Sequence, residues 1–233
     1  MLREHIPFIV DGKQIYLPFM AVYLQERGDA ESQSFETILP SAQMLLLYYI
    51  YRGCGEMPAS EAVGKLELTP TSISRATKQL EKMDLICSKE CGINKILYTE
   101  SNPKDLFLKA KDHLDNPVKR SIYVPRSDYV ESQLSGGYSA LSEYSMINPP
   151  AVRTVSVGSI SRWESSSTKT LLHGEEQCEI ELWRYDPLKL SSGKSVDPLS
   201  LALSLRDDND ERIEDAVDEM LDKLWEEING KRN

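Results

Sequence analysis

Apolar and polar residues alternate in blocks along the chain, and the first blocks predict a hairpin followed by a helix. Residues 6–24 place Asp11-Gly12 between two apolar, β-branched and aromatic runs, which is typical of a β-hairpin. Pro18 lies in the second run and favours the edge of a sheet for that strand. After a polar loop, Ser41 can cap a helix whose body, residues 44–51, is apolar on nearly every face. We expect this helix to be buried.

From Pro58 to Glu100 the pattern predicts a helix, a turn, a second helix and a hairpin. Thr69-Pro70 is a strong helix start, because Thr accepts free amide hydrogens of the first turn and Pro fits the first helical position. At about 100° per residue the second helix divides into two faces. The apolar face contains Ile73, Ala76, Thr77, Leu80 and Met83. The opposite face contains Thr71, Ser74, Arg75, Lys78 and Lys82.

The remaining sequence predicts a connector and then an α/β part. Residues 101–135 contain Asn102-Pro103, Asn116-Pro117 and Val124-Pro125, with an apolar-poor helical piece between, and we interpret them as the connector. Beyond Gly136-Gly137, a short helix ending near Ile147 and β-like runs at 152–157, 178–185 and 199–205 predict a sheet. Apolar residues between 213 and 228 follow a 3-4-3 spacing, which predicts an amphipathic helix covering that sheet.

Charge separates the chain into two parts with different surfaces. Residues 1–126 hold 16 Lys+Arg and 16 Asp+Glu, whereas residues 127–233 hold 11 and 21, so the whole net charge of −10 lies in the second part. The window 65–95 keeps a small basic excess, six cationic residues against four acidic ones. Any contact with nucleic acid must therefore come from a concentrated patch.

Composition indicates an ordinary water-soluble protein. No stretch approaches the ~18 consecutive apolar residues of a membrane helix, and residues 1–5 lack the layout of a signal peptide. Four scattered cysteines suit a reducing compartment and predict free thiols. We therefore expect a cytoplasmic protein without membrane contact.

The polar face of the helix that begins after Thr69 has the chemistry that a DNA major groove requires. Arg and Lys bind guanine edges, while Ser and Thr bind either bases or phosphates. In this hypothesis Arg75 and Thr71 read base edges. The phosphate-binding or flanking residues would be Ser72, Ser74, Lys78 and Lys82, with Thr69 at the start of the helix.

The stretch ASEAVGKLELTPTSISRATKQLEKMDLI, followed by Lys89 to Tyr98, resembles the winged-helix domain of MarR-like bacterial transcriptional regulators. The resemblance covers roughly residues 37–102. It implies that Thr69 to Met83 is the recognition helix, that Leu85-Ile86 and Lys95 to Tyr98 are the wing strands, and that Lys89, Asn94 and Lys95 are wing contacts. Glu90 departs from the Arg- and Gly-rich wings of such domains and would repel phosphate.

The acidic C-terminal part, with the runs SGGYSALSEYSMI and WRYDP, is similar to AbiEi-type antitoxins, which are autorepressing regulators paired with a nucleotidyltransferase toxin. The predicted fold is α+β. It comprises an N-terminal hairpin (1–36) that we expect to join the C-terminal sheet, a winged helix-turn-helix domain (37–102) and a connector (103–135). The last part is an acidic α/β domain (136–233) with a mixed sheet and a C-terminal amphipathic helix.

These observations predict a sequence-specific regulator of transcription that binds double-stranded DNA, in the role of a dimeric repressor. Dimerisation would place two recognition helices one DNA turn apart. The competing hypothesis is an antitoxin-like interaction module whose acidic C-terminal domain binds a protein partner.

Catalytic and metal-binding hypotheses have less support in the sequence. Cys87 and Cys91 lack the second close pair that a zinc site normally supplies. His173 with Glu175 and Glu176, or Glu179 with Glu181, would suit a hydrolase, but no phosphate loop, nucleophile elbow or His-Glu-x-x-His motif accompanies them. The expectation is no enzymatic activity, no metal and no cofactor.

Overall fold

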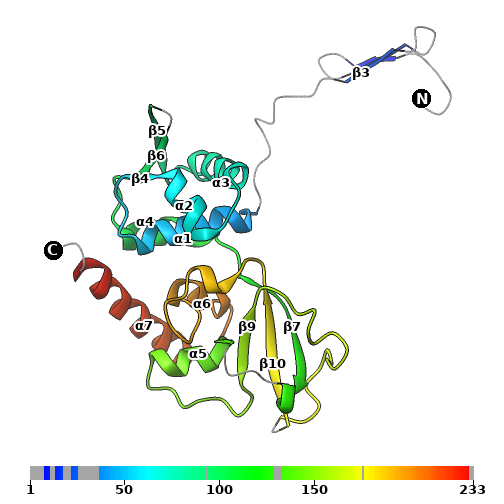
Figure 1. Cartoon of the computed structure of the whole chain (residues 1–233), viewed down its shortest axis with the longest axis vertical. Helices are drawn as coiled ribbons and strands as arrows, with labels where there is room; N and C mark the ends of the chain where they lie inside the picture. Colours follow the sequence, from blue (N-terminus) through cyan, green and yellow to red (C-terminus); the bar gives the residue numbers. More distant parts are fainter. Residues whose placement is uncertain are drawn as a thin grey trace. The chain divides into compact units, whose positions relative to one another are not determined.

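The computed structural model describes residues 8–10, 14–17, 22–25, 37–92, 94–128, 133–174 and 176–230 (Figure 1). The chain divides into two compact units, Met1–Glu36 and Thr37–Asn233. No helix in the described part of the chain has the length and apolar character needed to cross a membrane.

The first unit contains a three-stranded antiparallel sheet. Strands β1 (Phe8–Val10) and β2 (Gln14–Leu17) pair on either side of the predicted Asp11-Gly12 turn, which itself lies outside the described residues. A third strand, β3 (Val22–Gln25), pairs with the far side of β2. The second strand was predicted at a sheet edge. It is β2, the middle strand, because residues 22–25 form the separate strand β3 on its far side. Pairing of this segment with the C-terminal sheet stays a prediction.

Helix α1 (Pro40–Tyr51) lies in the core of the second unit, as its apolar sequence predicts. Its N-cap is Leu39, with Pro40 in the first turn, and the predicted cap Ser41 lies inside the helix instead. The buried amide of Gln43 donates to the Asp115 carbonyl at 2.8 Å and accepts from the Asp115 amide at 2.9 Å. This pair of bonds fixes α1 against the segment that leads to the larger sheet.

Starting with α1, the elements come in the order helix, strand, helix, helix, strand, strand. Strand β4 (Met57–Pro58) precedes α2 (Ala59–Leu66) and α3 (Pro70–Lys82), and β5 (Cys87–Cys91) and β6 (Asn94–Tyr98) complete a sheet of order β4-β6-β5. Glu67 ends α2 in the left-handed conformation, at φ 52°. The strand that the resemblance assigned to Leu85-Ile86 begins at Cys87 instead, because the chain is still leaving the turn after α3, where Asp84 is left-handed at φ 56°. Leu85 and Ile86 are buried in the main core.

The segment predicted as a connector is largely ordered secondary structure. It contains α4 (Pro103–Ala110), a 3-10 turn at Lys111–His113, β7 (Val118–Pro125), a second 3-10 turn at Arg126–Asp128 and β8 (Leu134–Ser135). Leu106, Phe107 and Ala110 place three buried side chains on one face of α4. The helical piece expected within the connector is α4. It packs in the main core, and β7 pairs with a strand of the larger sheet, so this segment is part of the folded unit.

The larger sheet has the order β7-β10-β9-β8 and is mixed, as predicted. Strand β10 (Gln177–Trp183) pairs antiparallel with β7 and parallel with β9 (Thr154–Val157), while β8 pairs antiparallel with β9. Helix α5 (Gly137–Tyr144) packs on β9. On the other face of the sheet lies a small apolar cluster that includes Ile180. Ile160 and Trp163, from the loop after β9, belong to this cluster.

The C-terminal helices differ from prediction in two ways. Residues 199–205, predicted as a strand, form most of α6 (Pro198–Ser204), which Asp197 caps. Every other residue there is Leu, but Ser200 and Ala202 between them are also buried, so the alternation does not indicate a strand. A 3-10 turn at Pro187–Lys189 precedes it. Helix α7 (Glu211–Gly230) is amphipathic as predicted, but it packs against α4, α5 and α6 rather than covering the sheet.

One hydrophobic core joins the two halves of the second unit, residues 37–126 and the acidic residues 127–230. It runs continuously from α1, α2 and α3 through α4 to α5, α6 and α7. The elements that carry the predicted DNA-binding residues therefore share their interior with the acidic half of the chain.

Candidate nucleic-acid interface

Helix α3 has one buried and one exposed face, with the division that its sequence predicts. The buried face contains Ile73, Ala76, Thr77 and Leu80. The exposed face contains Thr71, Ser74, Arg75, Lys78 and Lys82. The helix thus presents two hydroxyl groups and three cations to solvent on one side.

The first turn of α3 uses two of the predicted contact residues for its own cap. The Thr69 hydroxyl oxygen accepts from the Ser72 amide at 3.1 Å, and the two hydroxyl groups lie 2.9 Å apart. Pro70 occupies the first turn, where its missing amide hydrogen costs nothing. Thr69 is exposed and Ser72 is partly buried, so the primary role of this pair is to start the helix.

Arg75 and Lys78 are the cations on α3 whose charge is least compensated. Neither has a carboxylate within ion-pair distance among the residues that the structure describes. Both side chains are exposed, one turn apart on the same face. An incoming anion would meet them without first displacing an internal partner.

The two lysines of the β5–β6 hairpin are held by carboxylates of the protein. Lys89 forms a close ion pair with Glu56, and its ammonium lies 5.6 Å from the centre of the Tyr98 ring. The bond with Glu56 raises the pKa of Lys89. Lys95 lies 3.4 Å from Glu81. These two glutamates were missed by the sequence analysis, because their partners are 33 and 14 residues away.

A cavity of about 350 Å³ brings three of the predicted residues together. Side chains from α2, α3 and β6 line it, among them Ser74, Asn94 and Lys95. The exposed face of α3 and the start of β6 thus border the same hollow. Thr77 also lines the cavity, and its buried hydroxyl has no hydrogen-bond partner within the described residues.

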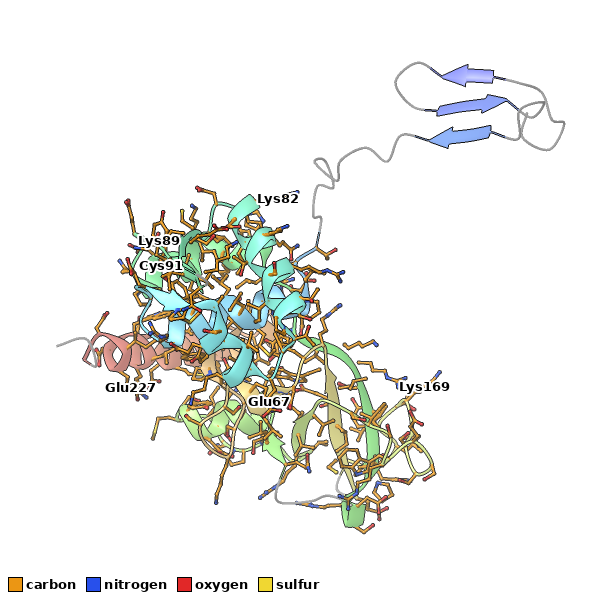
Figure 2. All side chains as sticks on the ribbon, turned by 45° about the horizontal axis from the view of Figure 1, so that its top comes forward. Glu67, Lys82, Lys89, Cys91, Lys169 and Glu227 are labelled. Atoms are coloured by element: carbon orange, nitrogen blue, oxygen red, sulfur yellow. The ribbon has the colours of Figure 1, made fainter. Side chains whose placement is uncertain are left out.

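Figure 2 labels Lys82 on α3 and both Lys89 and Cys91 on the β5–β6 hairpin. Glu67 lies between α2 and α3, and its carboxylate is 2.6 Å from the Lys189 ammonium. Lys189 belongs to the acidic half of the unit. This ion pair therefore ties the turn before α3 to the C-terminal part of the chain.

The residues considered for metal or acid-base chemistry do not converge. Cys87 and Cys91 are exposed at opposite ends of β5. Within the described ranges, no three His, Cys, Asp or Glu side chains are grouped so that they could hold a metal ion. His173 is exposed, and Glu175 lies outside the described residues.

Glu181 is buried on β10, although the alternation of Glu and apolar residues from Glu179 to Leu182 is typical of a half-exposed strand. Its carboxylate accepts from the Ser156 hydroxyl at 2.7 Å and from the Trp183 indole at 3.1 Å. Burial raises the pKa of Glu181. The Gly136-Gly137 pair at the start of α5 packs directly on this group, since a Cβ at Gly136 would lie 2.0 Å from the Ser156 hydroxyl oxygen. The paired glycines are the sequence signal for this close approach.

Comparison with family models, curated proteins and solved structures finds no match for this chain.

Proposed function

We propose that the protein is a sequence-specific DNA-binding regulator that inserts α3 into the major groove. The observation that carries the proposal is the exposed face of α3, where Arg75 and Lys78 have no carboxylate partner in the described structure and lie beside Thr71 and Ser74. Arg reads guanine by two parallel hydrogen bonds, and the short hydroxyl side chains suit bases or phosphates.

The element order supports a winged-helix interpretation of residues 37–102. A helix, a short strand, two helices and a two-stranded hairpin follow one another, and the three strands form one sheet. In that interpretation α3 is the recognition helix and β5–β6 the wing. Asn94 and Lys95 border the same cavity as Ser74, so phosphate contacts from helix and hairpin would be adjacent. A dimeric repressor acting on a two-fold site in the cytoplasm is part of this proposal.

The experiment is fluorescence anisotropy of the full chain on DNA from upstream of its own gene, over a salt series. Arg75→Ala is expected to cost about 1–3 kcal/mol and to relax discrimination at one base pair. Lys78→Ala is expected to weaken binding on all sequences and to lower the salt slope by about 1. The two variants therefore separate base reading from phosphate binding.

Lys169→Ala is the matched control, because it removes the same charge from an exposed site in the C-terminal half (Figure 2). We expect it to bind DNA as the wild type does. Equal binding by all four proteins, or binding that does not depend on sequence, would contradict the proposed role of α3.

A protein-interaction function is the second candidate, and the charge of α7 favours it. The exposed side chains of this helix include eight carboxylates, and its two cations, Arg212 and Lys223, are paired with Asp210 and Glu219. A basic partner protein would be attracted to this surface. Retention of partner binding in the Arg75→Ala variant, with DNA binding lost, would show that the two functions use separate surfaces.

A further inference from the structure

A cavity of about 320 Å³ lies between α4, α6 and α7, and none of the residues that line it belongs to α3 or to the β5–β6 hairpin. Phe107 of α4, Leu203 of α6 and Ile213 of α7 contribute its apolar lining, and all three are buried. The Phe107 ring also contacts Trp225, with ring centres 5.8 Å apart. The apolar lining of the cavity is therefore part of the main core, and it is preformed.

The rim of the cavity carries opposite charges on its two sides. Lys111, which follows α4, and Arg206, which follows α6, supply the cationic side. Arg206 donates to the Leu114 carbonyl, three residues after Lys111, so the two cations belong to neighbouring backbone segments. Glu214 and Asp218 supply the anionic side and lie one turn apart on α7.

The two sides of the rim do not neutralise each other. No ion pair between the cationic side and the anionic side occurs in the described structure. The nearby ion pairs are those of Arg206 with Asp207 and of Lys104 with Asp222. Both sides are exposed to solvent, whereas the lining below them is apolar. The cavity thus offers a positive site, an apolar site and a negative site in one hollow.

We propose that this cavity binds a small zwitterion with an apolar body, of the class of α-amino acids with large apolar side chains. The carboxylate would bind Lys111 and Arg206, the ammonium would bind Glu214 and Asp218, and the side chain would rest on Phe107 and Ile213. The volume is at the small end of the range for ligand sites, which favours a single amino acid over a larger molecule. A ligand with one charge would interact with only one side of the rim.

The test measures the thermal midpoint of the full chain with increasing L-phenylalanine or L-leucine, since a ligand that binds the folded state raises the midpoint. The methyl esters lack the anionic charge and the N-acetyl derivatives lack the cationic one. We expect a saturable rise with the free amino acids, and at least about tenfold weaker binding of both derivatives. No rise with either amino acid, or equal binding of the derivatives, would overturn the proposal.

The variant Asp218→Asn locates the site, with Asp215→Asn as its control. Both aspartates are exposed on α7, but only Asp218 lines the cavity. We expect Asp218→Asn to weaken L-phenylalanine binding by about tenfold or more and Asp215→Asn to leave it unchanged. Equal binding by both variants would place the ligand elsewhere. The proposal uses no residue of the DNA-binding face, so loss of either function leaves the other testable.

Discussion

At the scale of single residues, the charges around the β5–β6 hairpin decide what it can contribute to DNA binding. Lys89 and Lys95 are the cations that a phosphate would need, yet each already has a glutamate partner. The side chains of Lys89 and Glu56 remain 49% and 64% exposed, so water screens their attraction. A DNA phosphate can therefore compete with Glu56 for Lys89, and the glutamate lowers the net gain from that contact.

The variant Glu56→Gln releases Lys89 without altering the lysine. We expect it to bind DNA more tightly than the wild type, with a salt slope steeper by up to roughly 0.9, because the contact of Lys89 with a phosphate no longer requires an internal ion pair to break. The measurement is anisotropy over a salt series. Glu90→Gln is the control, since it removes an equal charge from an exposed position on the same hairpin. Equal effects of the two variants would mean that each only reduces the electrostatic repulsion between the protein and DNA, and that Lys89 makes no contact with DNA.

At the scale of elements, the sequence predicted best those helices that have both a capping signal and a long amphipathic pattern. Thr69-Pro70 located the start of α3, and the 3-4-3 spacing located α7. The sequence pattern failed to predict α6. Every side chain from Leu199 to Leu203 is buried, so no exposed polar position shows the helical period. Ion pairs such as Lys89 with Glu56 join residues far apart in the chain, so no local pattern could predict how available the hairpin lysines are.

The contact between α5 and the larger sheet depends on the absence of a side chain at Gly136. A Cβ there would lie 2.0 Å from the Ser156 hydroxyl oxygen and 2.7 Å from a Glu181 carboxylate oxygen, and these two groups already bond each other. We expect Gly136→Ala to lower the free energy of unfolding by about 1–3 kcal/mol, because the helix must move away from the strand. Urea denaturation measures the change.

Gly64 provides the matched control for that substitution. It lies inside α2, and a Cβ at this position would meet nothing within 4 Å. Gly64→Ala is expected to raise the free energy of unfolding by about 0.5–1 kcal/mol, because Ala restricts the unfolded chain and favours the helix. A Gly136→Ala protein as stable as the wild type would show that α5 is not fixed against Ser156 and Glu181.

At the scale of the whole second unit, one buried polar group joins the half proposed to bind DNA to the acidic half. The Tyr51 hydroxyl, at the end of α1, donates to the Asp197 carboxylate at 2.7 Å and accepts from the Leu199 amide at 2.9 Å. The same carboxylate oxygen accepts from the Ser200 amide at 3.0 Å and so caps α6. The other oxygen of Asp197 is buried and has no hydrogen-bond partner in the described structure. No cation compensates its charge through any described ion pair.

This group predicts a pH dependence of stability with a definite sign. Burial raises the pKa of Asp197 above its usual range, and the hydrogen bonds from Ser200 and Tyr51 only partly oppose that rise. Between the unfolded pKa, about 3.9, and the higher folded pKa, the native state binds more protons than the unfolded state. Stability from this group is therefore complete below the unfolded pKa and is lost as the pH rises through the folded pKa.

The variant Asp197→Asn keeps an acceptor for Tyr51 and a capping oxygen for α6, but it does not titrate. We expect its free energy of unfolding, relative to that of the wild type, to increase as the pH is raised from about 4 towards neutrality, because only the wild type must bury a charge. Urea denaturation at each pH, followed by tryptophan fluorescence and far-UV circular dichroism, measures the difference. Burial also raises the pKa of Glu181, but Glu181 is present in both proteins, so the difference isolates Asp197. A constant difference across this range would mean that Asp197 has the same pKa in the folded and unfolded states, and that the junction between α1 and α6 is open to water.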